Sequence, residues 1–210
     1  MNILLPGRLT FEAALTLQEH IVGQVQRGES DDTLILLEHE PVYTIGRTRD
    51  RSSLREALQH PVFETNRGGQ ATYHGPGQLT GYPILDLNRR GRDLHHYLRF
   101  LEEYLIRFSA SFGVAAQRRE GLTGVWVAER KLASLGVGVR KWISMHGFAI
   151  NILASSTAGF SSITPCGLTG VEMTSLERES GEQINFQSAL EAAAQTFEEM
   201  LPQLSANHAA

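Results

Sequence analysis

One cysteine is the first residue of the chain that could carry covalent chemistry. Cys166 stands between Pro165 and Gly167, in a segment rich in serine, threonine and glycine. Single cysteines are more often buried and inert. Here the proline stiffens the approach and the glycine gives freedom immediately after it, so we expect the thiol on a defined turn. A thiol in such a turn is a candidate nucleophile. One cysteine also excludes an internal disulfide and suits a reducing compartment.

A nucleophilic thiol needs a neighbour that favours the thiolate, because the pKa of a free cysteine is about 8.5. The chain has only two lysines, Lys131 and Lys141, among its 19 basic residues. Lys131 opens an apolar strand pattern, where alternation places it on one face with Ala133 and Leu135. The residues alone favour a strand-end lysine that reaches solvent.

The longest stretch of unusual composition runs from residue 67 to residue 87. Its glycines and prolines alternate with Arg, Gln, Thr, Tyr and His side chains, and it continues into an apolar strand. Glycine lets a ligand approach the main chain closely. A single Gly-Pro-Gly is better explained as a hairpin turn, but the length and polarity of the whole block favour a shaped binding loop.

Several motifs of other enzyme classes are absent. The sequence has no Gly-Lys-Ser/Thr phosphate loop, no G-x-G-x-x-G, no G-x-S-x-G and no H-E-x-x-H. Without a cysteine cluster we expect no structural zinc. His95 and His96 are adjacent on a predicted helix and do not share a face, so we read them as surface residues.

Hydrophobic periodicity predicts alternating helices and strands. Helices are expected from Thr10 to about Gly28, over 52–59, over 94–112, and from Glu182 or Asn185 to about Leu204. Strands are expected over 33–39, 42–46, 62–66, 123–128, 131–139 and 143–153, the last three as antiparallel neighbours.

Composition suits one globular domain. The chain has 210 residues, of which 41% are hydrophobic and 20% charged. We expect a single domain over 1–210, with a core of about 30–204 and a frayed tail at 205–210. No apolar run has membrane-spanning length, and the amino terminus lacks the pattern of a secretory signal. The default expectation is a cytoplasmic protein without a membrane partner.

Charge is uneven along the chain. Residues 47–141 hold 16 basic and 9 acidic residues, a net charge of +7, while the rest of the chain carries -11. No nucleic-acid recognition motif accompanies the basic middle, so we expect no nucleic-acid partner. Dispersal over the surface is the default, and an acidic protein partner is the functional alternative. The hypothetical docking residues are Arg89, Arg90 and Arg92, with some of Arg47, Arg49, Arg118, Arg119, Arg140 and Lys141.

Four motifs together resemble one known family. They are Arg-Gly-Gly-x-x-Thr-Tyr-His-Gly-Pro-Gly-Gln-Leu from Arg67, Leu-Leu-Glu-His-Glu-Pro-Val-Tyr-Thr-Ile-Gly-Arg from Leu36, the Lys-Leu-Ala-Ser-Leu-Gly strand from Lys131, and the Pro-Cys-Gly turn at Cys166. The chain resembles the lipoyl(octanoyl) transferases, which belong with the biotin and lipoate protein ligases. Glu40 stands where the family pattern leads us to expect a proline.

The resemblance implies an α/β (α+β) fold with a mixed, mostly antiparallel sheet and flanking helices, similar to the biotin/lipoate protein ligase catalytic domain. It implies Cys166 as nucleophile and Lys131 as its partner, with no metal and no cofactor. Two roles stay open for His74: it could hold its neighbours by hydrogen bonds, or it could move a proton. The implied substrate-binding residues are Arg67, Gly68, Gly69, Gln70, Ala71, Thr72, Tyr73, His74, Ser134, Leu135, Gly136, Gly147, Phe148 and Ala149.

The implied reaction is a two-step acyl transfer from octanoyl-acyl carrier protein to a lysine of lipoyl domains. The acceptors would be the 2-oxoacid dehydrogenase complexes and the glycine cleavage H protein. Three alternatives stay open: transfer between two lipoyl domains, an ATP-dependent lipoate ligase, and a non-catalytic module that binds acyl carriers. The sequence does not give the acyl-chain length, the particular acceptors or the oligomeric state.

Overall fold

The structure is a computed structural model that describes residues 1–55, 58–164 and 170–206. Within this part of the chain, eight strands form the main sheet. They are β1 (Asn2–Leu4), β2 (Arg8–Leu9), β3 (Thr33–His39), β7 (Gln78–Ile84), β8 (Gln117–Arg119), β9 (Leu122–Val127), β10 (Arg130–Arg140) and β11 (Ile143–Asn151).

The order of this sheet is β1-β3-β7-β11-β10-β9-β8, and β2 pairs with β3. β1 and β2 run parallel to β3, and the other pairs are antiparallel. This is the mixed, mostly antiparallel sheet that the family resemblance implied. The three strands expected as antiparallel neighbours are β9, β10 and β11.

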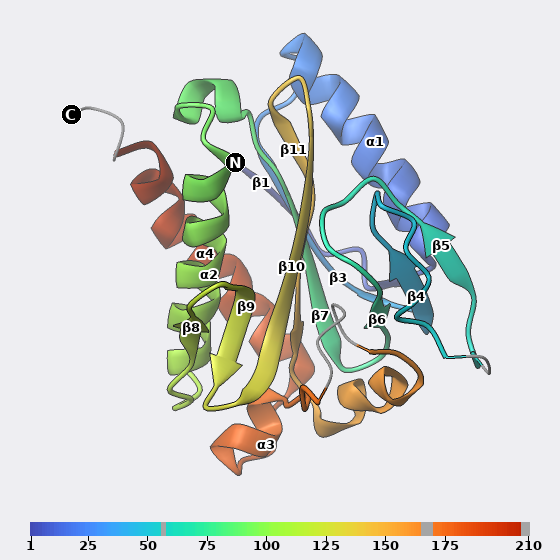
Figure 1. Ribbon diagram of the computed structural model, residues 1–210. Coiled ribbons are helices and arrows are strands. Elements are labelled where there is room, and N and C mark those ends of the chain that lie inside the picture. Colours follow the sequence, from blue (N-terminus) through green and yellow to red (C-terminus); the bar gives the residue numbers. More distant parts are fainter. Residues whose placement is uncertain (56–57, 165–169, 207–210) are drawn as a thin grey trace.

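A smaller sheet has the order β5-β4-β6, formed by β4 (Val42–Ile45), β5 (Val62–Glu64) and β6 (Thr72–His74). It lies with α1 (Phe11–Arg27) on one side of the main sheet, while α2 (Leu94–Ala110) and α4 (Phe186–Ala206) cover the other side (Figure 1). The short helices are η1 (Leu87–Arg90), η2 (Ala154–Ser162) and α3 (Leu176–Ser180).

The two faces of the main sheet bury different cores. On the α2 and α4 side, Leu79, Phe148 and Ile150 join the helices in the larger cluster. On the α1 side, Tyr82 and Ile84 belong to a second cluster with residues of the helix. Alternation along each strand explains this division, since successive side chains point to opposite faces. Residues of α1 therefore belong to the second cluster, together with residues of β3, β7 and β11.

The ends of the helices follow the expected signals. The Thr10 hydroxyl accepts a hydrogen bond from the Ala13 main-chain N–H, and Gly28 ends α1 in the left-handed region. Of the two predicted starts for the last helix, Asn185 is the one whose side chain caps it, by accepting from the Ser188 N–H. Only the first residues of the expected tail at 205–210 are described, and α4 runs through Ala206.

The short helix predicted over 52–59 is wrong for the residues there that the structure describes, which are 52–55 and 58–59. The Ser52 N–H donates to the Asp50 carboxylate in a turn. Leu54 then forms a β-bridge with Ile163 and packs in the cluster of Tyr43 and Phe160. Tertiary contacts with a distant segment therefore replace the local helical preference.

Candidate functional site

A pocket lies between the two sheets, over the middle of β7, β11 and β10. Thr80 pairs with Ala149, and Ala149 pairs with Ser134, so these three side chains form one row on one face. Gly136 pairs with Gly147, and both line the pocket two residues along β10 and β11 from Ser134 and Ala149. A sheet face covered by another layer usually carries large apolar side chains. These small residues leave the space that forms the pocket.

The walls of the pocket come from other elements and from Tyr82 and His146 of the floor strands. Residues of the glycine-rich loop and of β6 face the floor, and α1 contributes its first residue. The wall residues are Phe11, Arg67, Gly69, Thr72, His74, Tyr82 and His146, with Leu135 and Phe148 beside the floor. Three segments far apart in the sequence therefore meet at one site.

The glycine-rich loop is held against β10 where β9 stops. The pairing of β9 with β10 ends at Ala133. Beyond it, the Gly68 N–H donates to the Val137 carbonyl at 2.9 Å. Gly46 also touches this loop, because a Cβ atom there would lie 1.8 Å from the Gly69 carbonyl oxygen. The loop thus fits tightly between β10 and the end of β4.

Arg67 fixes the shape of the same loop. Its guanidinium donates to the carbonyl oxygens of Thr44 at 2.7 Å, Gln70 at 2.8 Å and Gly68 at 2.9 Å. The side chain is buried and lines the pocket. Arg67 therefore binds main-chain oxygens on both sides of the loop, and acts on the site by holding it.

Three hydroxyl groups on the pocket are buried without a partner among the described residues. They belong to Thr72, Thr80 and Ser134. An unpaired buried hydroxyl costs about 1–3 kcal/mol. Three such hydroxyls beside one pocket indicate a ligand whose polar group lies next to them.

His74 heads a chain of hydrogen bonds at one end of the pocket. Its Nδ1–H donates to the Gln78 side-chain oxygen at 2.8 Å. The Gln78 amide donates to Asn151, whose own amide donates to the Thr174 carbonyl. Burial, with the nearby charges of His39 and Arg67, holds the pKa of His74 well below its usual value. His74 thus holds its neighbours by hydrogen bonds, and its role in proton transfer stays a prediction.

Two further histidines lie beside Tyr82, and the ring of one of them, His39, is also 5.5 Å from the His74 ring. The Tyr82 hydroxyl donates to His39 Nε2 at 2.6 Å, and His39 Nδ1–H donates to the Leu9 carbonyl at 3.3 Å. The His146 Nε2–H donates to the Asn66 side-chain oxygen at 2.6 Å. Burial lowers the pKa of His39 and of His146 to about 4, with Arg67 as a second cause at His146.

Lys131 is 1% exposed, although the residues alone favoured a solvent-facing side chain. Its ammonium lies 5.3 Å from the centre of the Trp126 ring. Gly124 makes room for it, since a Cβ atom there would lie 2.8 Å from Lys131 Cε. The Lys131 main chain donates to Glu172 and accepts from Thr174, which joins it to the polar end of the pocket.

The structure brings together most of the predicted substrate-binding residues, and their role stays a prediction. Ten of them line the pocket: Arg67, Gly69, Thr72, His74, Ser134, Leu135, Gly136, Gly147, Phe148 and Ala149. Gly68 and Gln70 anchor the loop, and Ala71 is buried within it. Tyr73 points the other way, into the cluster of Tyr43 and Phe160. Cys166 lies outside the described residues.

Sequence reasoning missed Phe11, Thr80, Tyr82 and His146, which also line the pocket. Thr80 and Tyr82 share the alternation of β7, so the strand pattern could have indicated them. Phe11 is the first residue of a helix and gives no local signal.

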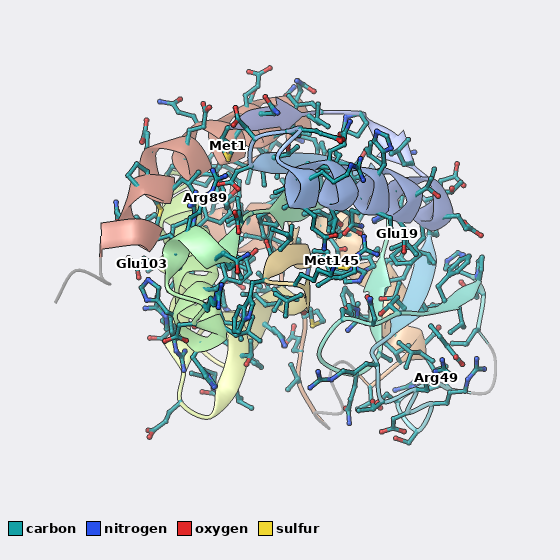
Figure 2. The ribbon with its side chains drawn as sticks, turned by 90° about the horizontal axis from the view of Figure 1, so that it is seen from above. Met1, Glu19, Arg49, Arg89, Glu103 and Met145 are labelled. Atoms are coloured by element: carbon teal, nitrogen blue, oxygen red, sulfur yellow. The ribbon has the colours of Figure 1, made fainter. Side chains whose placement is uncertain are left out.

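Two of the hypothetical docking arginines lie apart from each other. Arg89 and Arg49 lie on opposite sides of Met145 (Figure 2). The Arg90 side chain is 12% exposed and paired with Asp32, so its assignment to a docking surface is wrong. Other basic residues of the middle also have carboxylate partners, as Arg118 does with Glu103. At least nine of the 16 basic residues of this segment form ion pairs with carboxylates.

The described residues contain no group of metal-ligating side chains. Among their helices, none is long and apolar enough to cross a membrane. His95 is exposed and His96 half-buried, in keeping with their adjacent positions on α2.

Residues 10–198 match the family model of the lipoyl protein ligase A/B catalytic domain. The octanoyltransferase of Geobacter metallireducens is 55% identical over 181 residues, which cover 85% of this chain and 83% of that protein. The chain belongs to the octanoyltransferases of this family, and is an acyltransferase.

Solved structures show the same fold. The bi-partite lipoate protein ligase of Thermoplasma acidophilum, studied with its E2 lipoyl domain, has a TM-score of 0.69 at 16% identity, covering 96% of this chain and 84% of that one. The apo biotin protein ligase of Aquifex aeolicus has a TM-score of 0.56 at 12% identity, covering 98% and 71%. The fold expected for this octanoyltransferase from the sequence is confirmed.

Proposed function

We propose that this octanoyltransferase moves an octanoyl group from octanoyl-acyl carrier protein to lysines of lipoyl domains. The acceptors are the lipoyl domains of 2-oxoacid dehydrogenase complexes and the glycine cleavage H protein. Cys166 carries the acyl group between the two, and residues 1–210 act as one catalytic domain in the cytoplasm. The relationship to curated octanoyltransferases supports the acyl group, and the motifs around Cys166 and Lys131 support the route.

In the first step, the Cys166 thiolate attacks the carbonyl carbon of the donor thioester. The bond from that carbon to the carrier sulfur breaks, and the carrier leaves as a thiol after taking a proton. In the second step, the lysine ε-amine attacks the new thioester, loses a proton and expels the Cys166 thiolate. Exchange between two thioesters has a reaction free energy near zero, and amide formation from a thioester is favourable. The two-step reaction therefore needs no nucleotide.

The observation that carries this proposal is the burial of Lys131. Lysine is almost never fully buried in proteins without a specific partner. Here a glycine on the neighbouring strand makes room for it beside Trp126. A cation in this position can stabilise a nearby thiolate and give its proton to the departing carrier thiol, and the neutral amine that results can then take the proton of the incoming lysine. Ser134, three residues along β10, begins the pocket floor about 10 Å away at the usual rise of a strand.

The test is a reconstitution with purified octanoyl-acyl carrier protein and a lipoyl domain, without ATP. We expect an octanoyl amide on the acceptor lysine, detected by intact-protein mass spectrometry. Product that appears only with ATP and free octanoate would replace the transferase by a ligase. Product from an octanoylated lipoyl domain, but not from the carrier protein, would assign a different donor. Binding of the carrier without product under any of these conditions would leave a non-catalytic module.

A further inference from the structure

The pocket has two unlike ends. At one end Gln78, His74 and Asn151 form the hydrogen-bonded chain that reaches Thr174, and the Thr174 N–H donates to the Lys131 carbonyl. This end is polar. The hydroxyls of Thr72, Thr80 and Ser134 follow it along the floor and wall. A thioester carbonyl, whose oxygen accepts hydrogen bonds, suits this part of the pocket.

Farther along β7 the floor meets the core under α1, and the His39 ring, 5.5 Å from the His74 ring, joins Tyr82 to the polar part of the pocket. Side chains two residues apart on β7 point to the same face, so Thr80, Tyr82 and Ile84 follow one another along it. Thr80 lines the pocket, and Ile84 is buried in the cluster that α1 covers. Tyr82 lines the pocket and is also part of that cluster. The pocket therefore stops at the Tyr82 ring.

The Tyr82 ring is fixed in place. Its hydroxyl donates to His39 Nε2 at 2.6 Å, and His39 is held in turn by the Leu9 carbonyl. The His39 ring packs 5.6 Å from the Phe11 ring, and Phe11 also lines the pocket. Tyr82 lies edge-on to the His146 ring at 6.4 Å. A ring held by His39 and His146 cannot turn aside cheaply to admit a longer ligand.

We propose that Tyr82, held by His39, is the residue that sets the length of the acyl chain that this enzyme accepts. The inference rests on the proposed function, in which the pocket holds the acyl group with its carbonyl toward Lys131. The tail of the chain then points along the small-residue floor toward Tyr82. An added methylene at a closed apolar wall changes selectivity by roughly 10–200-fold.

The test compares hexanoyl, octanoyl, decanoyl and dodecanoyl pantetheine thioesters as donors. In Tyr82→Ala we expect the ratio of kcat/KM for decanoyl over octanoyl to rise about tenfold or more, the low end of that range. Tyr82→Phe keeps the ring but loses its hydrogen bond to His39, so its ratio should lie between those of the wild type and Tyr82→Ala. Tyr82→Leu also removes the ring but keeps more side-chain volume than alanine, and gives a second measurement if the alanine variant is poorly folded.

The matched control is Ile84→Ala, on the same strand and the same face, inside the core under α1. It should lower the melting temperature and leave the ratio unchanged. A folded Tyr82→Ala or Tyr82→Leu with the wild-type ratio would overturn the proposal, as would an equal shift in Ile84→Ala.

Failure of the proposed function would look different, since the wild-type protein would then transfer none of the four chains. Length selection can still be measured in that case. The shift in melting temperature with each free carboxylic acid gives the order of affinities without any transfer. We expect octanoate to give the largest shift in the wild type and decanoate or dodecanoate in Tyr82→Ala. The same order in both proteins would contradict the inference.

Discussion

Lys131 gives the most direct prediction at the scale of single residues. If its charge stabilises the Cys166 thiolate, Lys131→Ala should slow labelling by iodoacetamide at neutral pH and move the labelling curve to higher pH. Lys131→Arg keeps the charge but holds its proton, and its planar head differs in shape. It should therefore restore labelling better than turnover.

Lys141 provides the control, because it is the other lysine of the chain and is exposed in the turn between β10 and β11. Lys141→Gln should label and turn over like the wild type. An unchanged labelling curve in Lys131→Ala would mean that another group activates the thiol.

The Thr80 hydroxyl gives a prediction in which stability and affinity change in opposite directions. It has no partner among the described residues, so Thr80→Val should stabilise the empty protein by about 1 kcal/mol. If the hydroxyl binds the substrate, KM for the octanoyl donor should rise about tenfold, as for the loss of one hydrogen bond. Thr33 is a matched control on β3, because its hydroxyl already donates to the Asp31 carbonyl. Thr33→Val should destabilise the protein and leave KM unchanged. Loss of stability in Thr80→Val would show that the hydroxyl is paired after all.

At the scale of elements, the position of the glycine-rich loop depends on Gly46. A Cβ atom there would lie 1.8 Å from the Gly69 carbonyl oxygen, which is main chain and cannot move alone. Gly46→Ala should displace the loop, and a displacement of about 1 Å can lower kcat/KM about 100-fold. Gly23→Ala in α1 is the control, since its Cβ would meet only the flexible end of Arg27. It should be fully active and slightly more stable, by the greater helix propensity of alanine. Equal activity of the two variants would mean that loop position is unimportant.

Elements with strong periodicity could be predicted from the sequence, as α2 and β3 show. The segment at 52–59 could not, because Leu54 is placed by its bridge to Ile163 and by a nonlocal cluster. The site divides in the same way. The motifs indicated the loop and the β10 and β11 segments, whereas Phe11 and Tyr82 meet at the pocket only through tertiary packing.

Lys131 shows the same division at one position. The strand that contains Lys131 could be predicted from the sequence, but the burial of its side chain depends on Gly124 of the neighbouring strand. Which residue of β9 faces Lys131 is set by the register of the two strands, and a bulge shifts that register between Lys131 and Ala133. No local pattern encodes such a shift, so the burial of the ammonium could not be inferred from the residues alone.

Over the whole molecule, the buried histidines link stability to pH. The pKa of His39 and of His146 is about 4 in the folded protein, and near 6.5 in an unfolded chain. Below pH 6.5 the unfolded state thus binds more protons, so stability is complete above that pH and falls as the pH drops toward 4. Each histidine contributes a slope of up to about 1.4 kcal/mol per pH unit. Denaturant unfolding between pH 7.5 and 5 measures this slope.

His39→Gln should make the slope shallower, while His95→Gln on the exposed face of α2 should leave it unchanged. An equal slope in wild type and His39→Gln would show that His39 is protonated in the folded protein.

The central claim is that Cys166 holds the acyl group between donor and acceptor. Wild-type protein mixed with octanoyl-acyl carrier protein, without acceptor, should gain the mass of one octanoyl group, and peptide mapping should place it on Cys166. Hydroxylamine should remove it, and addition of a lipoyl domain should transfer it to the acceptor lysine as an amide that hydroxylamine does not cleave. Cys166→Ala should form neither adduct nor product. Full turnover by Cys166→Ala, or an adduct on another residue that is passed to the acceptor, would contradict the account.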